Sequence, residues 1–145
     1  MKRLMSGNAA IARGAWEAGV HYATGYPGTP STEILENLSE YADVGSEWST
    51  NEKVAFDEGM GAALGGIRTL VTMKHVGLNV AADPFMVFPY AGTNGGFVVL
   101  VADANTGWTS ADALRVVRRQ GSESPTLLQE RPIGANAYQT VRNDL

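Results

Sequence analysis

A glycine- and proline-rich turn with several hydroxyl groups is the first candidate for binding chemistry. It runs Gly25-Tyr26-Pro27-Gly28-Thr29-Pro30-Ser31-Thr32-Glu33 and leads into a predicted helix. Backbone N–H groups at the start of a helix, together with the helix dipole, favour a bound anion. A well-capped helix start without a ligand explains the same residues equally well. Both interpretations therefore stay open from the spacing alone.

An acidic group at a strand-to-helix junction is the second candidate. Glu52 lies in Trp48-Ser49-Thr50-Asn51-Glu52-Lys53, and the helix that follows is rich in small residues. Small side chains let a second helix or a second subunit approach closely. A carboxyl group held in such a place is partly shielded from water and can share a proton with a ligand nitrogen. A favourable charge in the first turn of a helix is the simpler alternative, and spacing alone favours it.

The third candidate combines a cation, an imidazole and an amide around a glycine, in Met73-Lys74-His75-Val76-Gly77-Leu78-Asn79. His75 could act as a general acid or base, or could donate a hydrogen bond to a carboxylate. A structural role is the commoner one for a single histidine, and His21 fits that role better. The spacing of the histidines predicts no metal site, and the motifs of serine hydrolases and of phosphate-binding loops do not occur.

The elements that must position these segments alternate between strand and helix. The apolar spacing predicts helices over 7–18, 30–41, from 51 onward and over 78–86, and strands over 20–24, 44–48, 68–74 and 97–102. The helix at 30–41 is expected to have Thr29 as its cap and Pro30 at its first position. Nearly all-apolar strands predict an α/β fold, a doubly wound, mostly parallel sheet with helices on both faces. Residues 110–120 show a weak helical pattern.

In such folds, ligands bind at the carboxyl ends of the strands, and each of the three segments follows a predicted strand. We therefore expect them to meet at one edge of the sheet. The 145 residues are 44% hydrophobic, carry a net charge of −4 and include no cysteine. This composition predicts one globular domain and excludes thiolate metal sites and cysteine-held iron–sulfur clusters on this chain. No strong basic stripe, membrane-length apolar run or secretory pattern is present, so we expect no nucleic acid, no membrane and a cytoplasmic location.

In this order and spacing, the three segments resemble the pyrimidine-binding domain of thiamine-diphosphate enzymes, specifically the N-terminal region of the indolepyruvate:ferredoxin oxidoreductase alpha subunit. Residues 23–33, 47–55 and 73–84 carry the resemblance, which extends from about residue 6 to 103. It implies a thiamine-diphosphate-binding fold over residues 1–120. Residues 121–145 then form an atypical C-terminal arm or tail.

The resemblance also implies roles for individual residues. Glu52 is expected to be the catalytic glutamate that hydrogen-bonds the ring nitrogen of the cofactor's aminopyrimidine and so activates thiamine diphosphate toward a 2-oxo acid. Besides Glu52, the residues implied to bind the cofactor are Pro27, Val76, Gly77 and Asn79. Thr29 and His75 are the implied substrate contacts.

The implied partners follow from what this sequence does not contain. Full-length relatives carry a Gly-Asp-Gly motif for Mg²⁺ and diphosphate, then cysteine-rich ferredoxin modules, and this chain has neither. The resemblance therefore implies that a partner domain, on another chain or a missing segment, anchors thiamine diphosphate with Mg²⁺. Iron–sulfur clusters are expected only on other domains or chains, with ferredoxin as electron acceptor. A homodimer or a hetero-oligomer is expected.

Two other functions stay open at this level. Short pyrimidine-domain subunits are typical of split non-oxidative decarboxylases that act on sulfopyruvate or phosphonopyruvate. A non-catalytic dimerisation module is the second alternative, because Arg115, Arg118 and Arg119 stand where the family has an acidic, serine-rich stretch. Substrate contacts that the family places there are not carried over to this chain.

Overall fold

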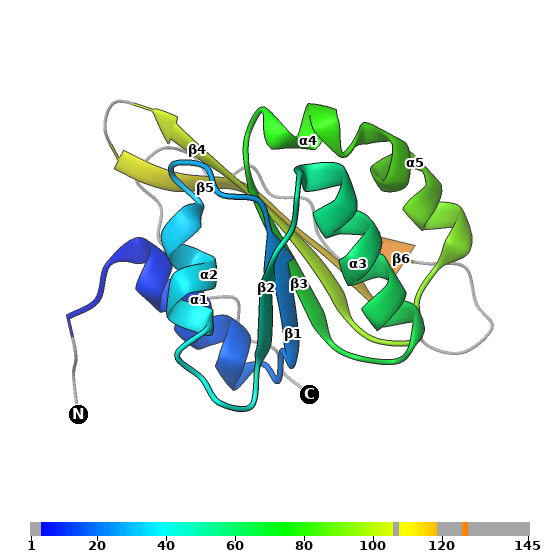
Figure 1. The fold of residues 1–145 in the computed structure, drawn as a ribbon, viewed down its shortest axis with the longest axis horizontal. Coiled ribbons are helices and arrows are strands. Elements are labelled where there is room, and N and C mark those ends of the chain that lie inside the picture. The colour runs from blue at the N-terminus through cyan, green and yellow to red at the C-terminus, as the bar shows by residue number, and fades with distance from the viewer. Residues whose placement is uncertain (1–3, 106–107, 119–125, 128–145) are drawn as a thin grey trace.

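The computed structural model describes residues 4–105, 108–118 and 126–127, with side-chain surroundings for residues 4–102 (Figure 1). The elements in chain order are α1 (Gly7–Glu17), β1 (Tyr22–Gly25), α2 (Thr32–Leu38), β2 (Gly45–Trp48), α3 (Glu52–Leu64), β3 (Thr69–Lys74), α4 (Gly77–Val80), α5 (Ala82–Ala91), β4 (Phe97–Asn105), β5 (Trp108–Arg118) and β6 (Thr126–Leu127). No helix in these ranges is long and apolar enough to cross a membrane.

One sheet of six strands, in the order β2-β1-β3-β4-β5-β6, forms the centre of the structure. The first four strands are parallel to one another. The last two are antiparallel to their neighbours, and β6 pairs with the end of β5. Strand β1 lies between β2 and β3 and is parallel to both, so the chain leaves the sheet after each of these strands at the same edge. The predicted α/β class and mostly parallel sheet are confirmed.

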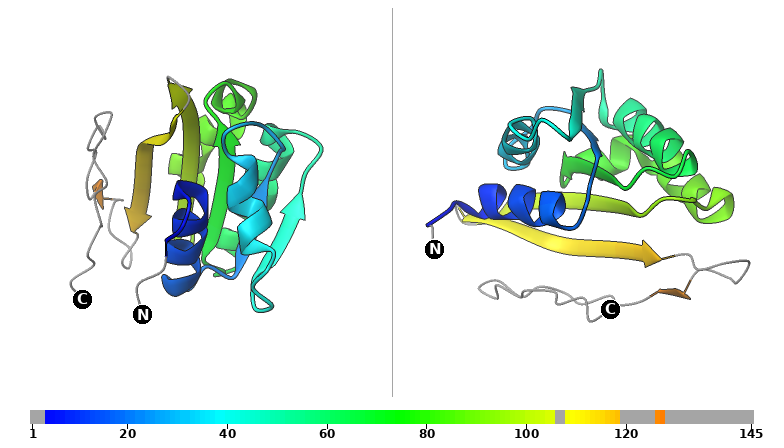
Figure 2. Two further views of the ribbon diagram at one scale, coloured as in Figure 1. Left: turned by 90° about the vertical axis from the view of Figure 1, so that its left-hand side faces the viewer. Right: turned by 90° about the horizontal axis from the view of Figure 1, so that it is seen from below.

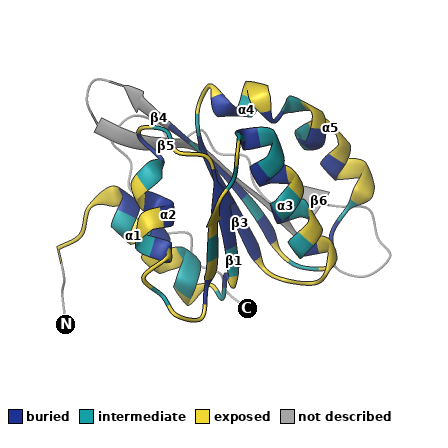
Figure 3. Cartoon of the chain, viewed as in Figure 1, coloured by how far each residue is buried: buried dark blue, intermediate teal, exposed yellow. Residues whose placement is uncertain are grey.

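Helices cover both faces of this sheet, as a doubly wound fold requires. Figures 1 and 2 show α2 and α3 on opposite sides of β1 and β3. Successive residues of β3 enter different cores: Leu70 packs with Ala12 and Leu35, whereas Val71 and Met73 pack with residues such as Phe56. This alternation follows from the two-residue period of a strand. Figure 3 shows that buried residues dominate the central strands.

Local signals in the sequence mark the ends of two helices. The Ser6 hydroxyl accepts a hydrogen bond from the Ala9 N–H and starts α1. Gly19, just after α1, adopts a φ of 78°, which favours glycine. The Asn51 side chain accepts a hydrogen bond from the Val54 N–H at 3.0 Å and fixes the start of α3. These caps act within one turn, so the sequence alone identifies them.

The predicted start of the second helix is wrong. Helix α2 begins at Thr32, not at Pro30, and ends at Leu38 instead of about residue 41. The Thr29–Pro30 peptide bond is cis. The Gly28 N–H donates to the Thr32 hydroxyl, and the Ser31 hydroxyl donates to the Gly28 carbonyl, each at 2.9 Å. These bonds fold the segment into a turn, and the helix starts only after it.

The helical prediction for residues 110–120 is also wrong. These residues largely fall in β5, which pairs antiparallel with β4 in a register that brings Val117 opposite Phe97. Pairing with a long neighbouring strand outweighs a weak local helical pattern, since strand formation depends on the partner strand. The predicted helix at 78–86 proves to be two helices, α4 and α5, with Pro84 in the first turn of α5. Backbone N–H groups in the first turn of a helix have no partner within the helix, so proline, which lacks an N–H, is tolerated there.

The proposed C-terminal arm stays a prediction. Of residues 121–145, only β6 lies within the described residues. The boundary at residue 120 and the remainder of the arm fall outside them.

Candidate functional site

The segments singled out in the sequence meet at the carboxyl edge of the parallel strands. Strands β2, β1 and β3 are neighbours and end at Trp48, Gly25 and Lys74. The loop after β2 leads directly into α3, and the short turn after β3 leads into α4. Figure 1 shows the start of α3 and helix α4 together at this end of the sheet. The expectation of one shared edge is confirmed.

Glu52 is buried at this edge. It is the first residue of α3, and only 4% of its surface is exposed. The Asn51 cap fixes the helix start, and a negative charge in the first turn of a helix is electrostatically favourable. Its Oε1 atom lies 3.8 Å from the Lys74 ammonium nitrogen. A carboxyl group is therefore held next to a cation and largely away from water.

The backbone of Gly77 forms one wall of this site. A Cβ atom added at residue 77 would lie 2.8 Å from the Glu52 Cγ and 2.9 Å from its Oε1. Any side chain at this position would displace the carboxyl group. Gly77 is the first residue of α4 and is itself buried. The absence of a side chain lets the turn after β3 lie directly against Glu52.

The Lys74 side chain crosses the loop that follows β1. A Cβ atom added at Gly28 would lie 2.7 Å from the Lys74 Cδ and 3.1 Å from its Nζ. The same Nζ lies 5.8 Å from the centre of the Tyr26 ring, within the usual range of a cation–π contact. The lysine stem thus lies against the Gly28 backbone, and its ammonium group lies near both the Tyr26 ring and Glu52.

The other predicted site residues lie on the two segments that surround this group, the loop after β1 and the start of α4. Pro27 and Thr29 flank Gly28 on the loop after β1, and both are exposed. His75, Val76 and Asn79 are exposed around the start of α4. The structure therefore brings all of the predicted segments to one edge, with Glu52 and Gly77 in direct contact. The roles of the five exposed residues stay predictions.

Two N–H groups of the turn before α2 are bonded within the turn itself. The Gly28 N–H is bonded to Thr32, and the Ser31 N–H donates to the Gly28 carbonyl at 2.9 Å. Helix α2 is only seven residues long. The two interpretations of this turn, an anion site and a capped helix start without a ligand, therefore both stay predictions.

A second polar cluster, which the sequence did not predict, consists of Thr24, Ser49 and Glu58. The hydroxyl groups of Thr24 and Ser49 both donate to the Glu58 Oε2, the former at 3.1 Å. The two hydroxyl oxygens lie 2.8 Å apart. The Ser49 N–H also donates to the Gly25 carbonyl at 2.9 Å. This cluster ties the loop that leads to Glu52 onto the end of β1 and the middle of α3.

The surroundings of this cluster also raise the pKa of the neighbouring Tyr22 phenol. Partial burial raises the pKa of Tyr22, and the nearby carboxylates of Glu58 and Glu47 raise it further, because both disfavour a phenolate. The available sequence signal was the periodicity of α3, which places Glu58 on a different face from Glu52. That periodicity does not reveal that two hydroxyl groups from β1 and from the loop after β2 meet Glu58.

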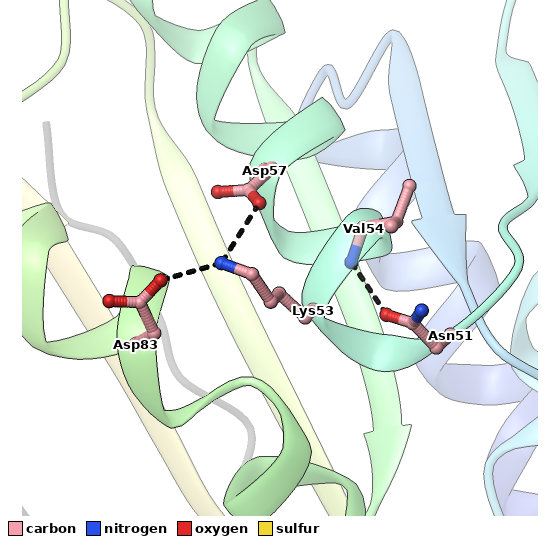
Figure 4. Close-up of polar contacts among 5 residues, drawn as sticks. All are labelled: Asn51, Lys53, Val54, Asp57 and Asp83. Atoms are coloured by element: carbon pink, nitrogen blue, oxygen red, sulfur yellow. Dashed lines mark hydrogen bonds and ion pairs between the residues drawn. The ribbon is translucent and has the colours of Figure 1, made fainter.

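A separate charged group lies on the outside of the same helix start (Figure 4). The Lys53 ammonium is 2.6 Å from an Asp83 oxygen and 3.7 Å from an Asp57 oxygen, and the side chains are substantially exposed. The hydrogen bond with Asp83 is the main cause that raises the pKa of Lys53. This group links α3 to α5 at the surface. Among the described residues, no three or more histidine, aspartate or glutamate side chains form a cluster suited to a metal ion.

Comparisons with known proteins identify relatives of the chain. No family model matches it. It is 52% identical to the indolepyruvate oxidoreductase subunit IorA of Archaeoglobus fulgidus over 109 residues, which are 70% of this chain and 18% of that subunit. It is 49% identical to the corresponding subunit of Pyrococcus horikoshii over 112 residues, 75% of this chain and 17% of that subunit.

A solved structure shares the fold. The 2-oxoglutarate:ferredoxin oxidoreductase from Magnetococcus marinus, solved with 2-oxoglutarate, coenzyme A and succinyl-CoA bound, matches with a TM-score of 0.62 and 20% sequence identity. The match covers 75% of this chain and 19% of that one.

Because of its sequence identity to the IorA subunits, the chain belongs to the family of the indolepyruvate:ferredoxin oxidoreductase alpha subunit. It spans less than a fifth of the length of the curated subunits that it matches.

Proposed function

We propose that the chain is the pyrimidine-binding domain of a thiamine-diphosphate-dependent 2-oxo acid:ferredoxin oxidoreductase of the indolepyruvate type. Glu52 activates the cofactor, and ferredoxin accepts the electrons. The observation that carries this proposal is the burial of the Glu52 carboxyl group against Gly77, at the carboxyl edge of the parallel strands. Similarity to subunits named for indolepyruvate oxidation supports the reaction class.

The residues present fit the aminopyrimidine part of the cofactor. Binding its ring nitrogen requires an acidic group that is shielded from water and can share a proton. Glu52 is 4% exposed and is fixed at a capped helix start. The bare backbone at Gly77 leaves the carboxyl group without a covering side chain on that side. These features support Glu52 as the group that holds the ring.

When bound, thiamine diphosphate supplies the nucleophilic carbon that attacks the keto group of a 2-oxo acid. In this proposal, Glu52 holds a proton at the ring nitrogen and orients the ring. Pro27, Val76, Gly77 and Asn79 contact the ring, whereas Thr29 and His75 contact the substrate. The exposed positions of Pro27, Thr29 and His75 are compatible with contacts to groups that arrive from outside this domain.

A partner domain completes the site in this proposal. It holds the diphosphate and Mg²⁺, and it belongs either to another chain or to a further segment of a longer protein. Large apolar side chains on α4, α5 and the turn before them support this, since they are 48% to 92% exposed: Val76, Val80, Met86, Val87 and Tyr90 (Figure 3). The assembly is a homodimer or hetero-oligomer, the iron–sulfur clusters lie on other domains or chains, and the complex is cytoplasmic.

The first test is calorimetry with thiamine diphosphate. We expect weak binding or none by this chain alone, and clear binding once a partner with the Gly-Asp-Gly motif is added. Tight binding by the isolated chain would contradict the need for a partner domain. No binding in the presence of any such partner would support a non-catalytic dimerisation module instead.

The second test is the turnover of the assembled enzyme with Glu52→Gln. Loss of this proton-sharing group should lower turnover at least about tenfold, since general acid–base catalysis contributes about 100-fold or more. The exposed Glu36→Gln change in α2 serves as the matched control and should leave turnover as in the wild type. Full turnover with Glu52→Gln would overturn the proposed role. Release of an aldehyde without any electron acceptor would instead indicate a non-oxidative decarboxylase.

A further inference from the structure

Lys74 is a half-buried cation whose ammonium group forms no hydrogen bond to the part of the chain that the structure describes. Its side chain is 29% exposed and lies at the carboxyl end of β3. The ammonium nitrogen is 3.8 Å from the Glu52 Oε1, which is too long for a hydrogen bond. The same nitrogen lies 5.8 Å from the centre of the Tyr26 ring. An ammonium group has three N–H donors, so this one can still take an acceptor.

The position of this ammonium group is fixed by the fold. Its stem passes so close to Gly28 that a Cβ atom there would lie 2.7 Å from the Lys74 Cδ. The carboxyl group of Glu52 lies 3.8 Å from the ammonium nitrogen and is itself packed against Gly77. Two positions without side chains thus place a cation and an acid side by side. Lys53, next to Glu52 in the sequence, differs because Asp83 and Asp57 already neutralise its charge.

We propose that Lys74 binds the carboxylate of the 2-oxo acid substrate, an inference that rests on the proposed function. A 2-oxo acid bears its carboxylate on the carbon next to the keto carbon. The cation that binds the carboxylate must therefore lie on the substrate side of the cofactor. The Lys74 side chain lies against Gly28, next to the proposed substrate contact Thr29. An acceptor within hydrogen-bond distance of the ammonium would form a charge-assisted bond, which is stronger than a neutral one.

The chemistry of decarboxylation predicts which kinetic step the bond between Lys74 and the carboxylate affects. The bound carboxylate leaves as neutral carbon dioxide, so a cation favours it more strongly before the reaction than in the transition state. An interaction of this kind strengthens substrate binding and does not speed the chemical step. Loss of Lys74 should therefore appear mainly as a higher KM.

A matched pair of lysine substitutions tests the proposal in the assembly of this chain with its diphosphate-binding partner. Lys74→Met should raise the KM for indolepyruvate at least about tenfold, the loss expected for one charge-assisted hydrogen bond. Lys53→Met removes an equal charge one residue from Glu52, outside the site, and should leave this KM as in the wild type. Lys74→Arg keeps the charge and should retain most of the affinity.

Equilibrium binding supplies a readout that does not depend on turnover. The probe is indole-3-propionate, a carboxylate that does not react. Calorimetry should show that Lys74→Met raises the Kd for this carboxylate at least about tenfold. The uncharged amide of the probe should bind Lys74→Met as it binds the wild type. An unchanged Kd for the carboxylate overturns the proposal. A raised Kd for thiamine diphosphate, with that for the carboxylate unchanged, assigns Lys74 to the cofactor's diphosphate and also overturns it.

The outcomes separate this inference from the function on which it rests. A wild-type assembly without thiamine-dependent turnover overturns both. A wild-type assembly that turns over, together with an unchanged KM in Lys74→Met, overturns the role of Lys74 alone. If Lys74→Met fails to fold, as judged by circular dichroism, Lys74→Gln provides the same loss of charge with a polar, half-exposed side chain, and the same expectations apply to it.

Discussion

The backbone of Gly77 and the carboxyl group of Glu52 are in direct contact. A Cβ atom at residue 77 would lie 2.8 Å from the Glu52 Cγ and 2.9 Å from its Oε1. Because these atoms belong to the outer part of a flexible side chain, the carboxyl group can move away from an added methyl group. The contact therefore controls the position of Glu52 more than the stability of the fold.

Gly77→Ala should displace the Glu52 carboxyl group without unfolding the protein. We expect the free energy of unfolding to change by less than about 1 kcal/mol, the usual range for a glycine-to-alanine change that the backbone tolerates. Binding of thiamine diphosphate by the assembly should weaken, because its acidic partner is misplaced. Urea denaturation and calorimetry check the two parts. An unaltered Kd for the cofactor, with a folded variant, would show that position 77 has no role in the site.

Two glycines on α3 should respond to alanine in opposite directions. A Cβ atom at Gly59 would overlap the Val71 Cγ2 in β3 and lie 3.2 Å from the Phe97 Cε2, whereas one at Gly61 would meet nothing within 4 Å. Overpacking a core costs about 1 to 3 kcal/mol, and replacing glycine by alanine within a helix contributes about 0.5 to 1 kcal/mol of stability. Urea denaturation should therefore show Gly59→Ala destabilised and Gly61→Ala stabilised. Equal effects of the two changes would refute the close packing of α3 on β3.

Features that depend on neighbouring residues in the chain were predictable from the sequence. Ser6 and Asn51 cap their helices through hydroxyl or amide groups that reach only a few residues ahead. The apolar strands and the glycines between elements likewise predicted the alternation of strand and helix and the mostly parallel sheet. A cap or an apolar period is a local signal, and the fold class follows from the order of such signals.

Features that depend on distant residues were not predictable. Strand β5 forms because β4 offers a partner along most of its length, and the local pattern of residues 110–120 does not contain that information. The late start of α2 depends on hydroxyl groups of Ser31 and Thr32 that turn back to Gly28. Proline before a helix is a good start signal on average, but here these competing hydrogen bonds prevail.

The same distinction between local and distant residues applies to the candidate site. The position of Glu52 at a strand-to-helix junction was visible in the sequence, and its burial follows from the fold. The approach of Lys74 to Glu52 was not visible in the sequence, because it depends on the backbone of Gly28, which comes from another loop. Glu58 was also missed, since its partners Thr24 and Ser49 lie 34 and 9 residues away in the chain.

The polar cluster of Thr24, Ser49 and Glu58 should contribute measurably to stability. Ser49→Ala removes one of two hydroxyl donors to the Glu58 carboxylate, and a hydrogen bond to a charged group contributes about 1.5 to 3 kcal/mol. Ser39→Ala, which removes an exposed hydroxyl group at the end of α2, is the control and should cost less than about 0.5 kcal/mol. Urea denaturation measures both changes.

A double-mutant cycle isolates the interaction within this cluster. Glu58→Gln combined with Ser49→Ala should cost less than the sum of the single changes, because each removes part of the same hydrogen bond. A coupling energy above about 0.5 kcal/mol is expected for residues in one network. Strictly additive costs would mean that Ser49 and Glu58 stabilise the protein independently.

The phenol of Tyr22 should make the protein less stable at alkaline pH. Burial, and then the charges of Glu58 and Glu47, raise its pKa in the folded state above the ordinary value of 10.0. Above about pH 10, the unfolded chain therefore loses a proton that the folded chain still holds. The stabilisation is complete below that pH and is lost as the pH rises through the folded-state pKa.

Substitution of single tyrosines isolates this effect from other alkaline titrations. Urea denaturation over a series of pH values on both sides of 10 should show a shallower loss of stability for Tyr22→Phe than for the wild type. Tyr90→Phe removes the same hydroxyl group at a position that is 92% exposed, and it serves as the matched control. Glu58→Gln should lower the folded-state pKa of Tyr22, because it removes one of the charges that oppose the phenolate. Parallel profiles for Tyr22→Phe and the wild type would show that the phenol titrates alike in both states.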